Sequence, residues 1–353
     1  MEEQQKNANK NANNFDRYNG KGLTGLANVG NTCYLNSCMQ ALSHTYEFND
    51  FLDSDYKKHI NEKPDTILLL EWDKLRTLMW SKNCNVAPWG FVKAVQRISK
   101  LKNREIFSGF IQNDVQEFLL FMLESFHNGL SREVEMTITG KAKNDKDILA
   151  QECYKMMKNM FKKDYSEIVK IFYGIQISEI KSIKDGTSLS IKPEPLIVLN
   201  LSIPKTLKDI KLIDCLNNYC LAERLEGDNA WFNEKLNEKQ DVTKGLSFWS
   251  LPQILIIDLK RWDFRGRKDQ RLVNIPFELD LTNYVKGYNK DSYHYNLYAI
   301  CNHSGGSGGG HYTATVKNAN GKWYNFNDLN TREIPKEKVV TNQAYCLFYR
   351  KIK

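Results

Sequence analysis

Cys33 and His311 have the residue types and surroundings that nucleophilic catalysis requires. Cys33 lies in GLANVGNTCYLNSCMQAL, directly after turn-forming Gly and Asn residues and at the start of an apolar spacing typical of a helix. We expect Cys33 in the first turn of that helix, capped by Asn31 or Thr32, where the helix dipole and unpaired N–H groups lower the pKa of a thiol. This position suits a thiolate nucleophile, and the alternative is a buried structural cysteine.

His311 precedes a hairpin that brings a polar partner to it. In GGGHYTATVKNANGKWYNFND, the pair Asn320-Gly321 separates two β-rich segments, which is a strong hairpin signal. A two-residue turn places His311 opposite residue 330, and a four-residue loop places it opposite Asp328. In either register, Asn327 or Asp328 comes close enough to hold one ring nitrogen of His311, as a general base requires.

A glycine-rich tract lies between His303 and His311. Its five glycines and two serines carry almost no side-chain bulk, so we expect a movable gate that suits a thin, extended substrate end. A nucleotide-binding loop is excluded, because the tract has no G-x-G-x-x-G or G-K-[ST] pattern and leads into a strand.

The segment QNDVQEFL opens an amphipathic helix with acidic residues in its first turn. Asp114 and Glu117 are explained either by capping and the helix dipole or by pairing with a basic substrate segment.

The remaining pattern divides the chain into helical and β-rich parts. Residues 1–21, rich in Asn, Lys and Gln, predict a disordered leader. Helices are expected after Cys33 and over 67–80, 91–98, 114–127 and 148–161, and β-rich runs begin with IVKIFYGIQI at residue 168. A charged, partly helical insertion spans 207–245. With 41% hydrophobic residues in 353, the chain can form a substantial core of the α+β class.

Composition argues against several other classes of protein. The net charge of +8 is spread over the chain without a basic stripe, which speaks against nucleic-acid binding. No apolar run reaches membrane-spanning length and the start lacks a secretory signal, so a reducing compartment is expected. None of the eight cysteines forms a C-x-x-C pair, so disulfides and a structural zinc site are not expected.

Four segments resemble, in order and spacing, the signature boxes of the ubiquitin-specific proteases, a family of papain-like cysteine deubiquitinases. They are GLANVGNTCYLNSCMQAL, QNDVQEFL, LPQILIIDLKRW, and GGGHYTATV with KWYNFND, within a match over about residues 23–352. The resemblance implies a papain-like fold over 22–353, with a helical thumb at about 22–165 and a β-rich palm and fingers at about 166–353. The fingers are expected at about 172–250.

The resemblance also implies roles for individual residues. It makes Cys33 the nucleophile, His311 the general base and acid, and Asn327 the residue that orients His311. Asn28 matches the oxyanion-hole asparagine of the family, and Asp328 resembles a supporting polar group. The residues expected to contact the C-terminal tail of ubiquitin, which carries arginines and ends in Gly-Gly, are Gln112, Asp114, Glu117, His303, Gly309, Gly310 and Tyr312.

One departure from the family concerns the fingers. Many members carry two C-x-x-C zinc pairs there, whereas this chain reads IFYGIQISEIKSI and LNNYCLAERLEGDNAW, with only Cys220 near the second pair. The sequence resembles the subset with zinc-free fingers that includes the herpesvirus-associated ubiquitin-specific protease. No metal or other cofactor is therefore expected.

The implied activity is hydrolysis of the isopeptide or peptide bond after the C-terminal glycine of ubiquitin. The expected partners are ubiquitin and ubiquitinated proteins, with no nucleic acid and no membrane, and the expected state is a monomer in the cytoplasm and/or the nucleus. The alternatives are a protease for another ubiquitin-like modifier, a non-catalytic ubiquitin-binding module and a nucleic-acid binder.

Overall fold

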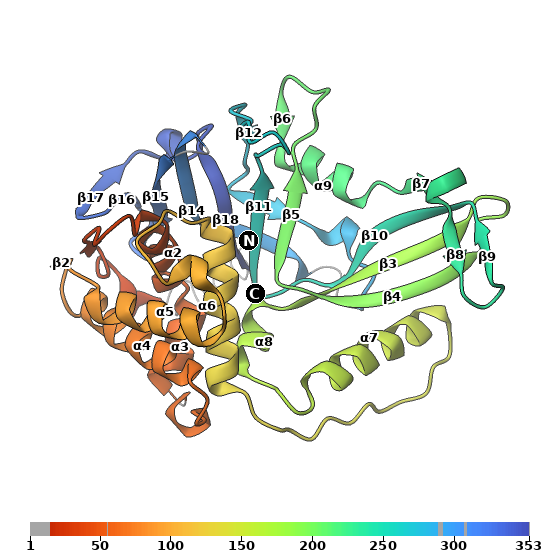
Figure 1. Ribbon diagram of the computed structural model, residues 1–353, viewed down its shortest axis with the longest axis horizontal. Coiled ribbons are helices and arrows are strands. Elements are labelled where there is room, and N and C mark those ends of the chain that lie inside the picture. Colours follow the sequence, from red (N-terminus) through yellow and green to blue (C-terminus); the bar gives the residue numbers. More distant parts are fainter. Residues whose placement is uncertain (1–14, 55, 289–291, 307–308, 353) are drawn as a thin grey trace, which may run out of the picture.

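A computed structural model of the chain describes residues 15–54, 56–288, 292–306 and 309–352. Figure 1 shows a helical part, a central sheet and a second, elongated sheet that extends away from the helices. The helices are η1 (Asp16–Tyr18), α2 (Cys33–Ser43), α3 (Tyr46–Ser54), η2 (Tyr56–His59), α4 (Asp65–Ser81), α5 (Trp89–Leu101), η3 (Glu105–Phe107), α6 (Val115–Leu130), α7 (Asp145–Phe161), α8 (Glu167–Phe172), α9 (Leu212–Cys220), η4 (Gly227–Asn229), η5 (Thr282–Tyr284) and η7 (Lys336–Lys338).

The strands follow mainly in the second half of the chain. They are β1 (Gly25–Leu26), β2 (Asn85–Val86), β3 (Gly174–Ser182), β4 (Ser188–Leu196), β5 (Val198–Ser202), β6 (Ile210–Lys211), β7 (Glu223–Leu225), β8 (Trp231–Asn233), β9 (Glu238–Gln240), β10 (Val242–Ser250), β11 (Ile254–Lys260), β12 (Val273–Asn274), β13 (Glu278–Asp280), β14 (His294–Gly306), β15 (Gly309–Lys317), β16 (Trp323–Asn327), β17 (Asn330–Ile334) and β18 (Ala344–Lys351). The mixed α+β class predicted from the sequence is confirmed. No helix in the described part of the chain is long and apolar enough to cross a membrane.

The thumb is built around α2, all of whose residues are buried. Helix α6 packs against it, α4 packs on α6 and α5 packs on α4, and the apolar faces of these helices form one core with the near face of the palm sheet. Helix α6 begins where the sequence predicted, because the side chain of Asp114 accepts hydrogen bonds from the backbone N–H groups of Gln116 and Glu117.

The palm is a sheet with the strand order β17-β16-β15-β14-β18-β11-β5, in which only the β11–β5 pair is parallel. Side chains alternate between its two faces. Ile254 and Ile256 of β11 face the thumb core, whereas Leu255, Ile257 and Leu259 belong to a second core behind the sheet. The palm therefore separates two apolar layers and is held rigidly between them.

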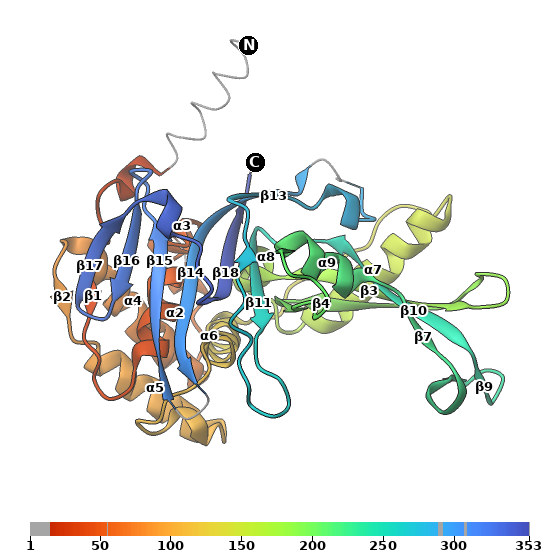
Figure 2. The same cartoon turned by 90° about the horizontal axis from the view of Figure 1, so that it is seen from above.

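The fingers are the sheet β4-β3-β10-β7 with the hairpin β8–β9 near its end (Figure 2). Helix α7, expected in the thumb, packs against this sheet, where Ala150 and Cys153 join Ile175, Ile177 and Trp249 in a small core. The predicted β-rich run from residue 168 begins as a helix instead, since Ile168–Phe172 lies within α8 and the strand starts at Gly174. Four apolar side chains of α8 are buried, so packing outweighed their β propensity.

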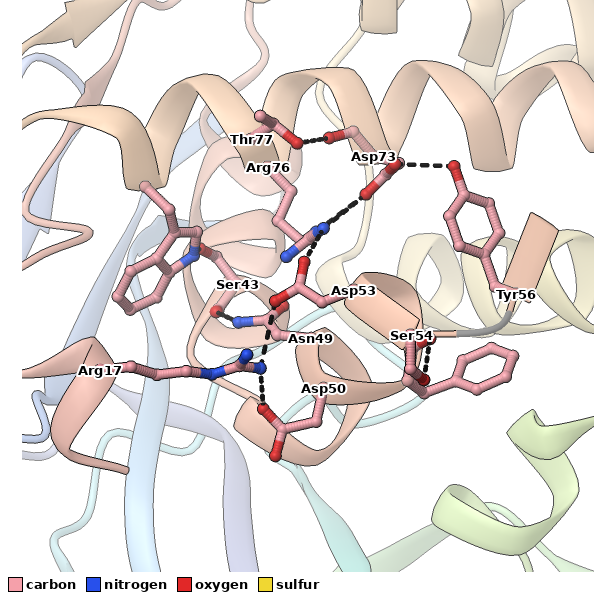
Figure 3. Close-up of polar contacts among 12 residues, drawn as sticks. Arg17, Ser43, Asn49, Asp50, Asp53, Ser54, Tyr56, Asp73, Arg76 and Thr77 are labelled. Atoms are coloured by element: carbon pink, nitrogen blue, oxygen red, sulfur yellow. Dashed lines mark hydrogen bonds and ion pairs between the residues drawn. The ribbon is translucent and has the colours of Figure 1, made fainter. Parts of the chain in front are cut away.

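The expected leader of residues 1–21 is partly wrong, because residues 15–21 pack against the thumb and palm. Arg17 forms ion pairs with Asp50 and Asp53, and Asp53 also binds Arg76 at 2.7 Å (Figure 3). Tyr18 is buried and stacks on Tyr46 with ring centroids 4.4 Å apart. The polar composition of the segment predicted disorder, but the buried ring of Tyr18 packs this segment against the thumb. Residues 1–14 lie outside the described part of the chain.

Arg350 joins the last palm strand to the thumb on the side of α3. Its Nε atom binds Glu47 at 2.7 Å and its Nη2 atom donates to the backbone oxygen of His44 at 2.8 Å. The guanidinium also lies 4.4 to 4.9 Å from the ring centroids of Phe15, Tyr46 and Tyr298. A largely buried cation thus has a carboxylate, a carbonyl and three aromatic faces as partners.

Candidate active site

Cys33 is the first residue of α2, as predicted, and is 1% exposed. Thr32 precedes it as the N-cap residue, but its side chain does not cap the helix; its hydroxyl accepts a hydrogen bond from the backbone N–H of Val29 at 3.0 Å. Helix α2 packs against β15, and the backbone N–H of Tyr312 on that strand lowers the pKa of the Cys33 thiol. This contact places the strand that carries His311 directly beside the cysteine.

The pKa of Cys33 differs from the prediction. Burial raises the pKa of the thiol above its usual value, and the charge of Asp328 adds to this, although the backbone N–H of Tyr312 acts in the opposite direction. In the free protein, then, the cysteine is held mainly as the thiol, and proton removal by a base becomes the step that activates it.

His311 has one ring nitrogen fixed by the neighbouring strand. Its Nε2 atom lies 2.7 Å from Oδ1 of Asn327, at the end of β16. Because an amide oxygen only accepts, Nε2 carries the proton and Nδ1 is unprotonated and able to take one. Of the two orienting residues that the hairpin analysis left open, the structure brings Asn327 to His311.

The hairpin register lies between the two that were predicted. Lys317 pairs with Trp323 and Ala314 with Phe326, and the backbone N–H of Asn318 donates to the oxygen of Lys322. Gly321 has a φ of +82°, whereas Asn320 does not have a positive φ. The type I′ turn, which needs positive φ at both central residues, is therefore replaced by a three-residue loop that ends in a left-handed glycine.

Asp328 contacts two asparagines and not His311. Its Oδ1 accepts from Nδ2 of Asn36 at 2.8 Å and its Oδ2 accepts from Nδ2 of Asn28 at 3.2 Å. Its backbone oxygen accepts from the N–H of Leu26 at 3.0 Å, and its φ is +48°. Asn36 holds Asp328 and was not predicted from the sequence, although its place one turn after Cys33 on α2 was a usable signal.

Asn28 is held at both ends of its amide. Oδ1 accepts the backbone N–H of Thr32 at 3.0 Å, and one N–H of Nδ2 is directed to Asp328. An amide nitrogen has a second N–H, which remains available to an oxygen atom in the cleft beside Cys33. The predicted oxyanion-hole role is compatible with this arrangement and stays a prediction.

The residues expected to contact a substrate tail lie where the thumb and palm meet. Gln112 forms two hydrogen bonds with the backbone of Gly310, across the cleft. Asp114 uses Oδ1 as the helix cap and accepts from the hydroxyl of Tyr345 at Oδ2, 2.6 Å away. Glu117 is exposed, so it can meet a basic group from outside.

His303 is buried beneath the glycine-rich hairpin. It is 5% exposed, and Nζ of Lys268 lies 2.8 Å from its Nδ1. Burial and the charge of Lys268 lower the pKa of His303 to about 4, so the ring is neutral at physiological pH. A contact between His303 and a substrate tail remains a prediction, and in the free protein Gly310 covers its ring.

The glycine tract is more regular than the expected movable gate. Gly305 pairs with Gly310 and Gly306 with Gly309, which extends the β14–β15 ladder almost to its turn. A Cβ atom on Gly310 would lie 2.2 Å from Nε2 of His303, so position 310 accepts no side chain. Residues 307 and 308 lie outside the described part.

Asp258 is a further buried acid near Asp114 that the sequence analysis did not single out. It is 6% exposed, and its Oδ1 atom has no hydrogen-bond partner among the described residues. Burial and the charge of Asp114 raise the pKa of Asp258 to about 7. The signal available in the sequence was a single acid inside the apolar strand ILIIDLK.

In the described part of the chain, no three His, Cys, Asp or Glu side chains are grouped so that they could hold a metal ion. In the fingers, Cys220 is half-buried, and burial raises the pKa of its thiol to about 11. The absence of a finger zinc remains a prediction.

Comparisons with known proteins agree with this geometry. Residues 24–349 match the family model described as ubiquitin carboxyl-terminal hydrolase. The chain is 33% identical over 342 residues to ubiquitin carboxyl-terminal hydrolase Usp2 of Drosophila melanogaster, covering 94% of this chain and 35% of that protein. It is 32% identical over 345 residues to ubiquitin carboxyl-terminal hydrolase 2 of Homo sapiens, covering 93% and 55%.

Among solved structures, the chain resembles the SAGA Ubp8/Sgf11/Sus1/Sgf73 DUB module bound to ubiquitin aldehyde, with a TM-score of 0.73 and 26% identity over 95% of this chain and 71% of that one. The chain spans between about a third and about half of the length of the curated relatives described above. Because the family model covers nearly the whole chain, the chain belongs to the ubiquitin carboxyl-terminal hydrolase family.

Proposed function

We propose that this protein is a cysteine-type deubiquitinase that hydrolyses the bond after the C-terminal glycine of ubiquitin. One observation carries the proposal: His311, whose Nε2 is fixed by Asn327, lies on β15, and β15 packs against α2, the helix that begins at Cys33. This arrangement supports a nucleophile, a base and an orienting amide at the junction of thumb and palm.

In the proposed reaction, Nδ1 of His311 takes the proton from Cys33 as the sulfur attacks the carbonyl carbon of the terminal glycine. The carbonyl oxygen becomes an oxyanion, which the free N–H of Asn28 and the backbone N–H of Cys33 stabilise. When the C–N bond breaks, His311 gives its proton to the leaving lysine amine, and a thioester remains. Water then attacks the thioester with His311 as base, which releases the carboxylate and restores the thiol.

Asp328 acts in this scheme as a positioning residue. It touches neither Cys33 nor His311 through its hydrogen bonds, but it holds the amides of Asn28 and Asn36. The side chain of Asn28 is thereby kept at one orientation before the reaction begins, which is the condition under which an oxyanion donor is effective.

The proposed substrate is ubiquitin attached to other proteins, and support comes from the names of the relatives and from the ubiquitin aldehyde bound to the structural neighbour. The acidic residues Asp114 and Glu117 lie at the proposed entrance for a tail that carries arginines. The protein is further proposed to act as a monomer in the cytoplasm and/or the nucleus.

The test is hydrolysis of ubiquitin bearing a C-terminal fluorogenic amide. Cys33→Ala should lower the rate by a factor of about 10⁴ or more, because no other nucleophile is available. Cys220→Ser, a half-buried finger cysteine, is the matched control and should retain activity. An inactive but folded wild type would contradict the proposal, and a preference for a different modifier in a panel of electrophilic probes would reassign the substrate.

A further inference from the structure

Gln112 bridges the thumb and the palm through two hydrogen bonds to a single residue. The backbone N–H of Gly310 donates to Oε1 of Gln112 at 2.8 Å, and Nε2 of Gln112 donates to the backbone oxygen of Gly310 at 2.5 Å. Gln112 lies just before α6, whereas Gly310 lies in β15. A side-chain amide bound in this way presents the donor and acceptor that a residue on a neighbouring antiparallel strand would present.

The edge of β15 that Gln112 covers has no strand beside it in the described part of the chain. On one side, β14 pairs with β15 from Gly309 to Val316. On the other side, β16 pairs only with Ala314 to Lys317, so the edge before Ala314 is left open. An open strand edge is a site to which an extended peptide can add by main-chain hydrogen bonds.

The same edge leads to the nucleophile. The strand β15 packs against α2, which begins at Cys33, and the backbone N–H of Tyr312, two residues after Gly310, lowers the pKa of the Cys33 thiol. Alternate residues of a strand direct their backbone groups to the same neighbour, and two residues span about 7 Å. An extended chain that pairs with Gly310 therefore brings its end to Cys33 about two residues further on, which suits a tail that ends in Gly-Gly.

The closed arrangement also shields the cleft. Cys33 is 1% exposed, and a Cβ atom on Gly310 would lie 2.2 Å from Nε2 of His303 and 2.6 Å from the backbone oxygen of Ser304. Gly310 cannot carry a side chain at this position. At the open strand edge, its backbone groups are occupied by the amide of Gln112.

We propose that Gln112 is a displaceable placeholder that occupies the backbone groups of Gly310 in the free enzyme until the substrate tail takes them over. This inference rests on the proposed function and adds a closed resting state to it. In the closed state, Gln112 forms two hydrogen bonds with Gly310, and in the open state water or the substrate tail forms them instead. Because two hydrogen bonds break and two form, the closed and open states are close in free energy. The apparent affinity for substrate is then the intrinsic affinity multiplied by the fraction of molecules that are open.

The first experiment needs no ubiquitin. Wild type and Gln112→Ala are treated with iodoacetamide at fixed pH, and alkylation of the Cys33 peptide is followed by mass spectrometry. We expect alkylation about 3- to 10-fold faster in Gln112→Ala, because the cleft is open more often. Gln112→Glu lacks the donor for the oxygen of Gly310 and should behave in the same way. Gln116→Ala, at the second residue of α6, is the matched control and should leave the rate unchanged.

The second experiment measures hydrolysis of the ubiquitin amide by the same variants. Removal of the placeholder should lower KM about 3- to 10-fold with kcat within twofold of wild type. A raised KM, or an unchanged rate of alkylation, overturns the proposal and leaves Gln112 as a simple substrate contact. Faster alkylation in an enzyme that does not cleave any ubiquitin amide supports the closed resting state and contradicts the proposed function.

Discussion

The cleft and the fingers are held together by different kinds of contact. At the cleft, hydrogen-bonded side chains join distant parts of the chain, as when Asp328 holds Asn28 and Asn36. In the fingers, the long β3–β4 and β3–β10 ladders are supported by a small apolar core around Trp249 and by the larger core to which Leu196 and Phe248 belong. The geometry of the cleft is thus fixed by specific pairs, whereas the shape of the fingers depends on packing, and substitutions should separate the two.

The largest effect is expected on stability, from Trp249→Ala in the fingers. Trp249 is 3% exposed and contacts Tyr288 edge to face at 5.3 Å, so its removal should lower the free energy of unfolding by about 3–5 kcal/mol. Urea denaturation measures this, and kcat below the unfolding transition should change less than twofold. Leu221→Ala, at a finger position that is 71% exposed, is the control. A fall in kcat that matched the loss of stability would show that cleft and fingers are not separable.

The next effect is expected on catalysis, from Asp328→Ala in the cleft. The amide of Asn28 loses its acceptor, so kcat should fall about 10- to 100-fold while KM stays within about threefold. Because Asp328 acts through Asn28, the double variant Asn28→Ala/Asp328→Ala should be no slower than Asn28→Ala alone. Additive losses would instead assign Asp328 a role that does not pass through Asn28.

A smaller and pH-dependent effect is expected for Asp258→Asn. The pKa of Asp258 is raised from 3.8 in the unfolded chain to about 7 in the folded protein, by burial and by Asp114, with Lys260 opposing. Between pH 3.8 and about 7, Asp258 is therefore protonated in the folded protein and ionised in the unfolded chain. The free energy of unfolding falls as the pH rises through this window. The variant should be about 1–3 kcal/mol more stable than wild type near pH 8, and this gain should vanish near pH 4.

Thermal unfolding of wild type and Asp258→Asn across that pH range measures the difference. Asp263→Asn, at an acid whose pKa is lowered by hydrogen bonds in an exposed loop, is the control and should show no gain at high pH. A constant difference between wild type and Asp258→Asn at all pH values would contradict the titration of Asp258.

The smallest effect is expected from removal of metal ions. Apolar packing supports the fingers where many family members carry cysteine pairs, so EDTA should change neither the activity nor Tm by more than about 1 °C. Metal analysis by mass spectrometry checks the same point. A large loss of stability on chelation would show that the fingers depend on an ion after all.

The sequence predicted the fold class and the main helices because the periodicity of α2, α4 and α6 follows directly from their buried faces. Other features depended on contacts that no local pattern displays. Residues 15–21 look polar, but Tyr18 finds a partner in Tyr46. The run from residue 168 looks like a strand, but its first part is buried as α8.

The sequence predicted which segments carry the proposed catalytic residues, but not which side chains form hydrogen bonds with one another. The hairpin signal predicted that His311 lies near Asn327 and Asp328. The structure has a three-residue loop, and there Asn327 binds His311 whereas Asp328 binds Asn28. The expected low pKa of Cys33 was wrong in direction, because a helix start predicts stabilisation of the thiolate but burial in the tertiary structure opposes it.

The contacts of Arg350 bear on how the cleft can open. This arginine ties the last palm strand to Glu47 and to the backbone of His44, beneath three aromatic rings. Arg350 therefore fastens the palm sheet to the thumb on the side of α3. Because thumb and palm also share one apolar core, we expect Cys33 to become accessible by a change where Gln112 binds the glycine hairpin, without separation of thumb and palm as whole bodies.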